Sequence, residues 1–416
     1  MRQDLSLVLD NRAANNKPGM HALVIGISAY SHLPKASDGI GDPVFKMGGL
    51  ASPALTAWKI GEWLRDPNTL LEYPLKTLRL LTSPDPQEII SGHPDAQSNP
   101  PSPATRDNIQ YALRRWRDDA RQEPNGCTFF YFGGHGLRAD NNDAIILAED
   151  FLEPDWTNLD RTLKFLDVIN GMAPNASQAK ISKVQFYFLD CCRNKPADKN
   201  LTDLDLARVR GTFLESGDGP DLRTRMAYFA TVDGGTAISR AGNLTYFGDM
   251  LLEAVTTGAS NGLEPGQPHP RGKTRFPVTG PSLTQFFERR RKQRGLDPIE
   301  AAAIYGRSGK LEILCWLQTP PLIDITFVIA DPELREDALV TLKSDSGLII
   351  QVQQPVQNGQ NLFKDLPMGR YEILVRSISN VVDPLTFGVQ YITPNSPDPW
   401  LLSLDMAMPY LSGGVT

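Results

Sequence analysis

The segment Val184-Gln-Phe-Tyr-Phe-Leu-Asp-Cys-Cys-Arg-Asn194 joins an apolar run to a cluster of reactive side chains. The run is aromatic and has the length of a buried parallel strand. It ends at a carboxylate, two cysteines and an arginine, and unpaired charges are rarely buried in a protein core. The segment therefore predicts a central strand whose carboxyl end carries chemistry.

A second segment, Cys127-Thr-Phe-Phe-Tyr-Phe-Gly-Gly-His-Gly136, has the same form. In an open α/β sheet, ligands and chemistry collect outside the carboxyl ends of the strands. If the two runs are neighbouring parallel strands, His135 and the cysteine pair emerge at the same edge of the sheet. A thiol beside an imidazole makes a nucleophile and its base.

The rest of the first three quarters of the chain alternates between apolar runs and helical patterns, which is typical of an α/β domain with a mostly parallel sheet. Residues 83–104 are rich in Pro, Ser and Asp and predict an exposed insertion. Further strands are expected at 21–30, 75–81, 226–232 and 311–317, and helices at 53–64, 105–116, 163–172, 246–255 and 282–294.

Thr319-Pro-Pro321 predicts a domain boundary, because only short strand-like runs separated by turn residues follow it. We expect an N-terminal arm at 1–19, a catalytic domain at 20–319 and an all-β sandwich at 322–416. The segment Leu366-Pro-Met-Gly-Arg-Tyr-Glu-Ile-Leu-Val375 resembles the turn-and-strand signature of prealbumin-like, immunoglobulin-type sandwiches. This last domain carries no catalytic pattern and is interpreted as a docking or regulatory module.

Composition limits the partners and the compartment. The net charge of −6 argues against a nucleic-acid partner, and the basic run at 289–294 is interpreted as a solvated helix face. No apolar run has the roughly 18 residues of a membrane span, and the first residues lack a signal-peptide core. Four cysteines in 416 residues do not make a disulfide framework. We therefore expect a cytoplasmic protein with no membrane partner.

Simpler interpretations of the reactive residues were weighed. A lone histidine such as His135 is often a satisfied core residue, but three glycines around it leave room for a ligand. Cys191 and Cys192 could be packing residues, although the flanking charges of Asp190 and Arg193 make their burial costly. A zinc site lacks a CxxC pair and a second histidine at ligand spacing, so no metal is predicted.

These motifs resemble those of the caspase-like cysteine peptidases, the group that holds caspases, metacaspases, paracaspases and gingipain-like enzymes. Caspases carry their histidine about 50 residues before the nucleophile, and here the separation is 192 − 135 = 57. Phe132-Gly-Gly-His-Gly136 is similar to the metacaspase Tyr-Ser-Gly-His-Gly motif. Segments at 22–27, 105–109 and 246–252 also resemble family segments, so the likeness covers about residues 20–318.

The resemblance implies a caspase-like three-layer sandwich and a cysteine endopeptidase. Cys192 takes the place of the nucleophile and His135 that of the base, with Cys191 as the second candidate nucleophile. The backbone N–H groups of Gly136 and Cys192 would hold the oxyanion. The expected partners are protein substrates, and no cofactor is expected.

Specificity depends on Asp190, which stands two residues before the nucleophile, as in metacaspases. A carboxylate beside the site attracts a cation, so cleavage after Arg or Lys is expected, in proteins with exposed basic residues. Two positions depart from the metacaspase pattern. Pro53 stands where a second acid is usual, and Gly133 replaces a serine. The missing charge could come from Asp233, Asp38 or Asp42.

The segment 193–225 has two interpretations, a solvated linker or an activation loop that is cut. An enzyme specific for basic residues could process itself after one of four arginines, which are Arg208, Arg210, Arg223 and Arg225. An upstream protease or a partner protein could also act on the loop. Metacaspases often need calcium, so calcium is a candidate activator, although no loop has strong calcium-ligand spacing.

The resemblance suggests a regulated effector in a bacterial stress, cell-death or defence response, antiviral defence included. The alternative from another class is an inactive caspase homologue that acts as a scaffold and binds through its β-domain. The presence of both His135 and Cys192 favours the enzyme.

Overall fold

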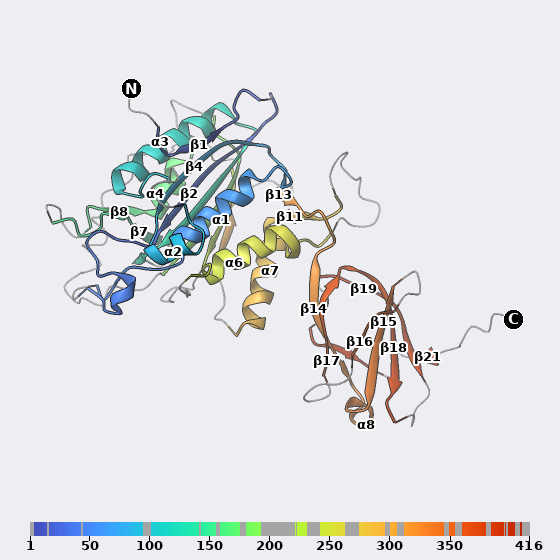
Figure 1. Cartoon of the computed structure of the whole chain (residues 1–416). Helices are drawn as coiled ribbons and strands as arrows, with labels where there is room; N and C mark the ends of the chain where they lie inside the picture. The colour runs from blue at the N-terminus through green and yellow to red at the C-terminus, as the bar shows by residue number, and fades with distance from the viewer. Residues whose placement is uncertain are drawn as a thin grey trace. The chain divides into compact units, whose positions relative to one another are not determined.

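The structure is a computed structural model of the 416-residue chain (Figure 1). It describes residues 4–14, 16–42, 45–94, 101–140, 143–154, 159–174, 180–192, 221, 223–230, 242–262, 274–295, 300–305, 312–344, 349–353, 360–379, 384–394, 396, 398–403 and 408–409. The chain divides into two compact units, one of Met1–Leu252 with Phe287–Cys315 and one of Glu253–Phe286 with Trp316–Thr416.

The first unit is organised around a seven-stranded sheet. In spatial order its strands are β1 (Leu7–Asp10), β4 (Leu75–Ser83), β2 (Met20–Ile27), β5 (Cys127–Gly134), β9 (Val184–Cys191), β10 (Thr224–Phe229) and β12 (Glu300–Tyr305). The five inner strands are parallel, and the two edge strands run antiparallel to their neighbours. If the five parallel strands are numbered from one to five along the chain, their spatial order is 2-1-3-4-5. This is a doubly wound order, and its switch point lies between β2 and β5.

Helices cover both faces of this sheet, which is why nearly all residues of its inner strands are buried. All eight residues of β2 are buried. Its Gly26 faces α1 (Pro53–Arg65), where a Cβ would lie 2.5 Å from the Cβ of Ala57. Its Leu23 and Ile25 join the core on the opposite face, under Trp116 of α3 (Arg106–Gln122). The predicted α/β class with a mostly parallel sheet is confirmed.

The remaining elements of the first three quarters of the chain are smaller. A three-stranded antiparallel sheet extends from the end of β5, made of β6 (Gly136–Asp140), β7 (Asp143–Leu147) and β8 (Thr162–Lys164). The others are η1 (Ala36–Asp38), β3 (Leu70–Leu71), α2 (Pro86–Ile90), α4 (Phe165–Gly171), α6 (Tyr246–Glu253), the π-helical turn η2 (Ala254–Gly258), β11 (Pro277–Thr279), α7 (Gly280–Gln293) and β13 (Ile313–Trp316). In the described parts of the chain, no helix has the length and apolarity needed to cross a membrane.

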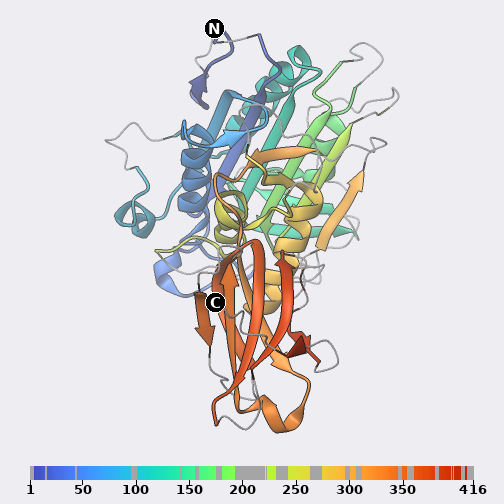
Figure 2. The same cartoon turned by 90° about the vertical axis from the view of Figure 1, so that its right-hand side faces the viewer.

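The second unit contains a β-sandwich, whose strands, from Leu322 onward, are coloured from orange to red in Figure 2. One sheet has the order β17-β14-β20 and the other β16-β15-β18-β19-β21. Every second residue of β14 is buried, the pattern of a strand with one face on a core. The predicted C-terminal all-β fold is confirmed. Its elements are β14 (Leu322–Ile329), α8 (Pro332–Arg335), β15 (Ala338–Ser344), β16 (Ile349–Gln353), β17 (Gln360–Pro367), β18 (Gly369–Ser377), β19 (Leu385–Ile392), β20 (Trp400–Leu402) and β21 (Met408–Pro409).

Candidate active site

The two chemistry-bearing segments form neighbouring parallel strands. In the register of β5 and β9, Gly133 lies opposite Asp190 and Gly134 lies opposite Cys191. Continued by one residue, the same register sets His135 opposite Cys192, on adjacent strands that lie about 5 Å apart. The backbone therefore delivers the imidazole and the thiol to the same edge of the sheet.

His135 is fixed by three contacts. Its backbone N–H donates to the Tyr30 hydroxyl at 2.7 Å, and the two rings lie 5.0 Å apart, centroid to centroid. Its Nε2 lies 2.7 Å from the carbonyl oxygen of Gly48. Because a carbonyl only accepts, Nε2 carries the proton, and in the neutral ring Nδ1 is the basic nitrogen. Burial lowers the pKa of His135 below its ordinary value, which favours the neutral ring at pH 7.

The two cysteines occupy different surroundings. Cys191 is 1% exposed and belongs to the apolar core beneath α3, with Phe132 and Leu189. Cys192 is partly exposed. Side chains of consecutive strand residues point to opposite faces, so only one of the two thiols can face the core. Cys192 is therefore the thiol that a substrate can reach.

Gly136 follows the histidine and packs against the cysteine pair. A Cβ at this position would lie 2.6 Å from the carbonyl oxygen of Cys192 and 2.8 Å from Sγ of Cys191. Both distances are shorter than any ordinary contact, and one partner is backbone. The backbone at the end of β9 can approach this closely only because residue 136 has no side chain.

We expect Gly136→Ala to lower peptidase activity by about a hundredfold, because the added methyl must displace the backbone that carries Cys192. The measurement is kcat/KM on a peptide substrate. The matched control is Gly61→Ala in α1, where the new Cβ would lie at an ordinary 3.4 Å from Leu80 and a helix gains from alanine. Equal activity in the two variants would contradict the close packing inferred at Gly136.

Asp190 is a buried carboxylate at the foot of this site. It is 3% exposed and accepts hydrogen bonds from the Tyr131 hydroxyl at 2.8 Å, from the Thr245 hydroxyl and from the backbone N–H of Gly248. Burial raises the pKa of Asp190 to about 6, and these donors oppose the rise. No side chain in the described ranges forms an ion pair with it. It is therefore mostly ionised at pH 7 without a cationic partner among those residues.

Of the other acids considered from the sequence, Asp38 and Asp42 make local hydrogen bonds, and Asp233 lies outside the described residues. The Asp38 carboxylate accepts from the backbone N–H of Lys35 at 3.1 Å, and that of Asp42 accepts from the backbone N–H of Phe45 at 2.5 Å. Both bonds are local to the loop after β2.

A buried acid that the sequence did not indicate caps helix α1. Pro53 at the first position of α1 has no N–H to donate. The next two backbone N–H groups, of Ala54 and Leu55, donate to the Ser28 hydroxyl at 3.0 Å and to the Glu88 carboxylate at 2.9 Å. Glu88 also accepts from Ser28 at 2.9 Å, and its side chain comes from α2. Part of the expected exposed insertion is thus buried, because α2 supplies this cap.

Glu88 should make stability depend on pH. Burial raises the pKa of Glu88 to about 7, so its ionisation disfavours the folded state and stability falls as pH rises from about 4.5 to about 7. In Glu88→Gln this loss is absent. From about pH 5 to about pH 8, the free energy of unfolding of the wild type should therefore fall by roughly 2 kcal/mol relative to that of the variant. Urea denaturation of both proteins measures it, and parallel pH curves would contradict the assignment.

The four candidate processing arginines fall into two groups. Arg208 and Arg210 lie outside the described residues. Arg223 is 3% exposed, and its guanidinium donates to the carbonyl of Ile169 at 2.9 Å and to Gln185 at 3.0 Å. Arg225 lies within β10, opposite Gln185. A protease could reach these last two only by pulling β10 out of the sheet.

Metal ligands were also sought. In the part of the chain that the structure describes, no group of three His, Cys, Asp or Glu side chains is placed to hold a metal ion. Calcium as an activator therefore stays a proposal from the family resemblance.

Sequence reasoning missed the groups that orient the site, namely Tyr30, Gly48, Tyr131 and Thr245. A backbone carbonyl such as that of Gly48 carries no residue-type signal. Tyr131 and Asp190 do carry such a signal. Tyr131 lies opposite Phe188, two residues before Asp190 on the adjacent strand, so the two side chains share a face. A hydroxyl on the same face as a buried carboxylate suggests a hydrogen bond.

Residues 89–271 match the family model of the Peptidase C14 caspase domain, and this segment contains His135, Asp190 and Cys192. The match supports a cysteine peptidase of the caspase-like kind, in agreement with the α/β fold. A search among curated proteins finds no match.

Proposed function

We propose that this chain is a cysteine endopeptidase that cleaves proteins after Arg or Lys, with Cys192 as nucleophile and His135 as base. The observation that carries the proposal is the pairing of β5 with β9, whose ends are followed directly by His135 and by the partly exposed Cys192. The contact of His135 Nε2 with the Gly48 carbonyl supports an oriented imidazole. The match to the caspase domain supports a peptidase in general.

The geometry suggests how each group acts. The neutral His135, with its proton on Nε2, takes the thiol proton at Nδ1 as Cys192 Sγ attacks the peptide carbonyl. The same proton then goes to the leaving amine, and an acyl-enzyme forms. Water hydrolyses it with His135 again acting as base. The N–H groups of Gly136 and Cys192 stabilise the oxyanion in this proposal.

The preference for basic residues rests on Asp190. An ionised carboxylate that is nearly fully buried is costly, and a cation in contact with it offsets that cost. The guanidinium or ammonium group of a substrate would supply the cation. Asp190 is the only acid that the described residues place at this position, and a single carboxylate can pair with a guanidinium or with an ammonium group. This supports a pocket that accepts both Arg and Lys.

The test is a panel of fluorogenic peptides that differ only in having Arg, Lys or Asp before the cleaved bond, with Cys192→Ala as control. We expect turnover of the first two substrates alone. Turnover of the Asp peptide alone would overturn the role of Asp190. No turnover of any peptide, with or without calcium or prior limited proteolysis, would favour the inactive scaffold.

The physiological role is proposed from the family resemblance, as a regulated effector in a bacterial stress, cell-death or defence response. Four cysteines in 416 residues do not make a disulfide framework, which supports action in a reducing compartment such as the cytoplasm. Activation by self-processing is proposed at Arg208 or Arg210, since Arg223 is buried and Arg225 is held in β10. Identical, uncut masses of purified wild type and Cys192→Ala would contradict it.

A further inference from the structure

A cavity of about 820 Å³ lies within the first unit, away from the site just described. It is lined by residues of α3, β1 and β4 and by residues that precede β5 and β9. Five of its side chains are cationic, namely Arg12, Arg79, Arg115, Arg121 and Lys180. Three are acidic, namely Asp4, Asp118 and Asp119. The lining therefore has a formal charge of 5 − 3 = +2, in a chain whose net charge is −6.

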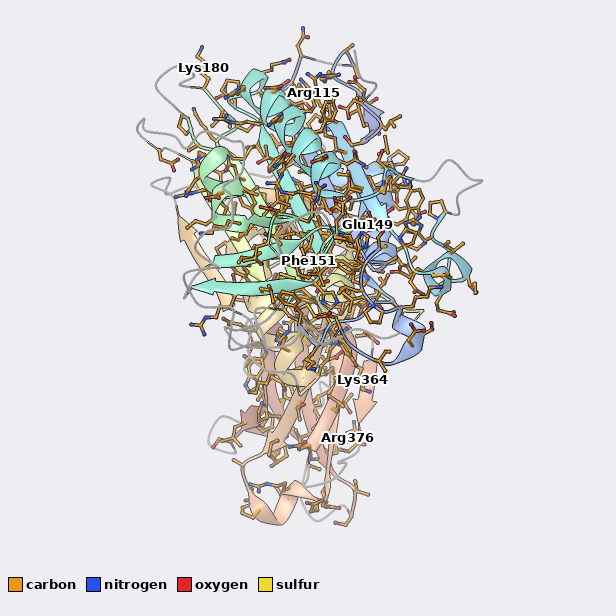
Figure 3. All side chains as sticks on the ribbon, turned by 90° about the vertical axis from the view of Figure 1, so that its left-hand side faces the viewer. Arg115, Glu149, Phe151, Lys180, Lys364 and Arg376 are labelled. Atoms are coloured by element: carbon orange, nitrogen blue, oxygen red, sulfur yellow. The ribbon has the colours of Figure 1, made fainter. Side chains whose placement is uncertain are left out.

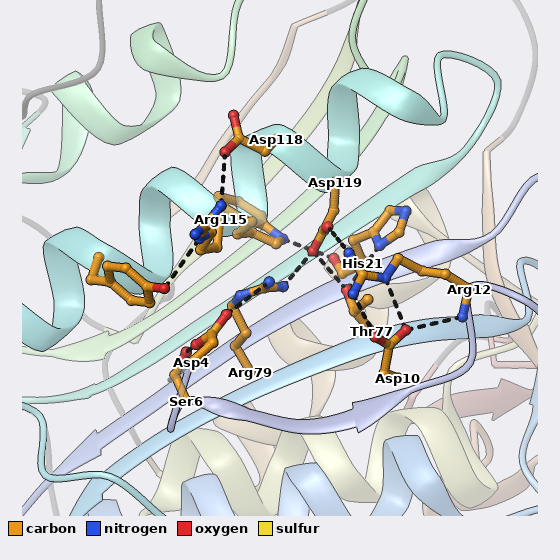
Figure 4. Close-up of polar contacts among 12 residues, drawn as sticks. Asp4, Ser6, Asp10, Arg12, His21, Thr77, Arg79, Arg115, Asp118 and Asp119 are labelled. Atoms are coloured by element: carbon orange, nitrogen blue, oxygen red, sulfur yellow. Dashed lines mark hydrogen bonds and ion pairs between the residues drawn. The ribbon is translucent and has the colours of Figure 1, made fainter. Parts of the chain in front are cut away.

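The buried side of the cavity holds an unsatisfied donor. Arg79 is 2% exposed, and its two terminal nitrogens pair with Asp119 and, at 3.2 Å, with Asp4. Its Nε–H has no hydrogen-bond partner. Figure 4 shows the guanidinium of Arg79 between the two carboxylates. The paired guanidinium keeps a buried positive charge at the base of the cavity.

Two of the three acids of the cavity are already engaged with the buried Arg79 and the exposed Arg12. Asp119 accepts from Arg79 and from Arg12 at 3.1 Å, and Asp4 accepts from Arg79 and from Ser6 at 2.6 Å. They leave little negative charge for the outer part of the cavity.

On the outer side, three cations face one carboxylate. Arg121 lies 3.4 Å and Arg115 lies 4.0 Å from Asp118, while Lys180 is exposed. Arg115 also stacks over the ring of Tyr111, with its guanidinium carbon 5.3 Å from the ring centroid. Figure 3 labels Arg115 and Lys180 at the same end of this unit. This rim combines excess positive charge with an aromatic surface.

We propose that this cavity binds a small phosphate-bearing molecule, with phosphate oxygens accepting from Arg115, Arg121 and Lys180. Guanidinium groups match phosphate oxygens in charge and in geometry. The volume lies in the range that encloses ligands of nucleotide size. Gln122 and Lys180 line it just before β5 and β9 begin, whereas His135 and Cys192 follow the ends of those strands. The eight residues of β5 span roughly 26 Å, which separates the cavity from the end of the strand where His135 and Cys192 follow. A ligand in the cavity is therefore too far from Cys192 to be its substrate and would act as an effector.

The test is isothermal titration calorimetry of the full chain with ATP, tripolyphosphate and inorganic phosphate at constant ionic strength. Arg115→Gln is compared with Arg114→Gln, its neighbour on α3, which is also exposed but does not line the cavity. We expect saturable binding that Arg115→Gln weakens by about tenfold and Arg114→Gln leaves unchanged. Equal affinity for ATP and tripolyphosphate would show that only the phosphates are recognised. Tighter binding of ATP would show that the base is recognised as well.

Two outcomes would overturn the proposal. The first is no saturable binding of any of the three probes. The second is equal weakening by both arginine variants, which would show that only the general charge of α3 matters. The readout is binding and needs no peptidase activity, so its failure is distinct from failure of the proposed peptidase function. Both substituted residues are exposed, so neither change should prevent folding.

Discussion

Cys192→Ala should lower kcat/KM on a basic peptide by at least about a thousandfold, whereas Cys191→Ala should change it by no more than about threefold. The two cysteines are adjacent and chemically identical, so the difference depends only on their surroundings. Cys192 is partly exposed beside the imidazole, while Cys191 is 1% exposed in the core under α3. The measurement is steady-state kinetics of the two variants and the wild type, prepared in parallel.

Cys191→Ala is expected to act on stability. Removal of a buried sulfur leaves a small cavity and should cost about 1 kcal/mol in the free energy of unfolding. Cys192→Ala should cost less, because its side chain is not part of the packed core. If Cys191→Ala abolished turnover and Cys192→Ala did not, the roles assigned to the two thiols would have to be exchanged.

The sequence predicted the inner strands well, because burial on both faces leaves a strong signal. The strands that precede His135 and Cys192 are mostly apolar and are buried at every position, and the structure makes them neighbours. Edge strands leave a weaker signal. β1 and β12 were not predicted, and each is held by antiparallel pairing to one neighbour. β17 was missed as well, since its Asn361 and Asp365 suggest a loop although Asn361 is buried opposite Phe327.

The polar surroundings of the site were much less predictable. Tyr30 and Gly48 reach His135 from the chain that follows β2, about 90 to 105 residues earlier in the sequence. No residue pattern indicates such a contact, because it is set by how a loop folds back over the sheet edge. Glu88 was hidden in a Pro- and Ser-rich segment that predicted exposure, yet its carboxylate caps α1. In each case a backbone group is one partner, and backbone groups carry no sequence signal.

Asp190→Asn should lower kcat/KM on peptides with Arg or Lys before the cleaved bond by about a hundredfold or more. It should change cleavage after an uncharged residue by only a few-fold. A substrate cation that enters a buried site without its counter-charge loses most of the interaction that offsets its desolvation. Asparagine has the shape of aspartate, and the hydroxyls of Tyr131 and Thr245 can turn to accept from its amide. Thermal melting of the variant checks that the fold is kept.

The pH dependence separates a charge effect from a packing effect. Because burial raises the pKa of Asp190 to about 6, the carboxylate that binds a cation forms only as pH rises through that value. For basic peptides, kcat/KM of the wild type should therefore rise through about pH 6, and this limb should be absent in Asp190→Asn. Tyr131→Phe removes one hydrogen bond to the carboxylate and should shift the limb to higher pH. If Asp190→Asn instead lowered the rates for basic and uncharged peptides equally, Asp190 would be a structural residue, and the preference for Arg and Lys would need another source.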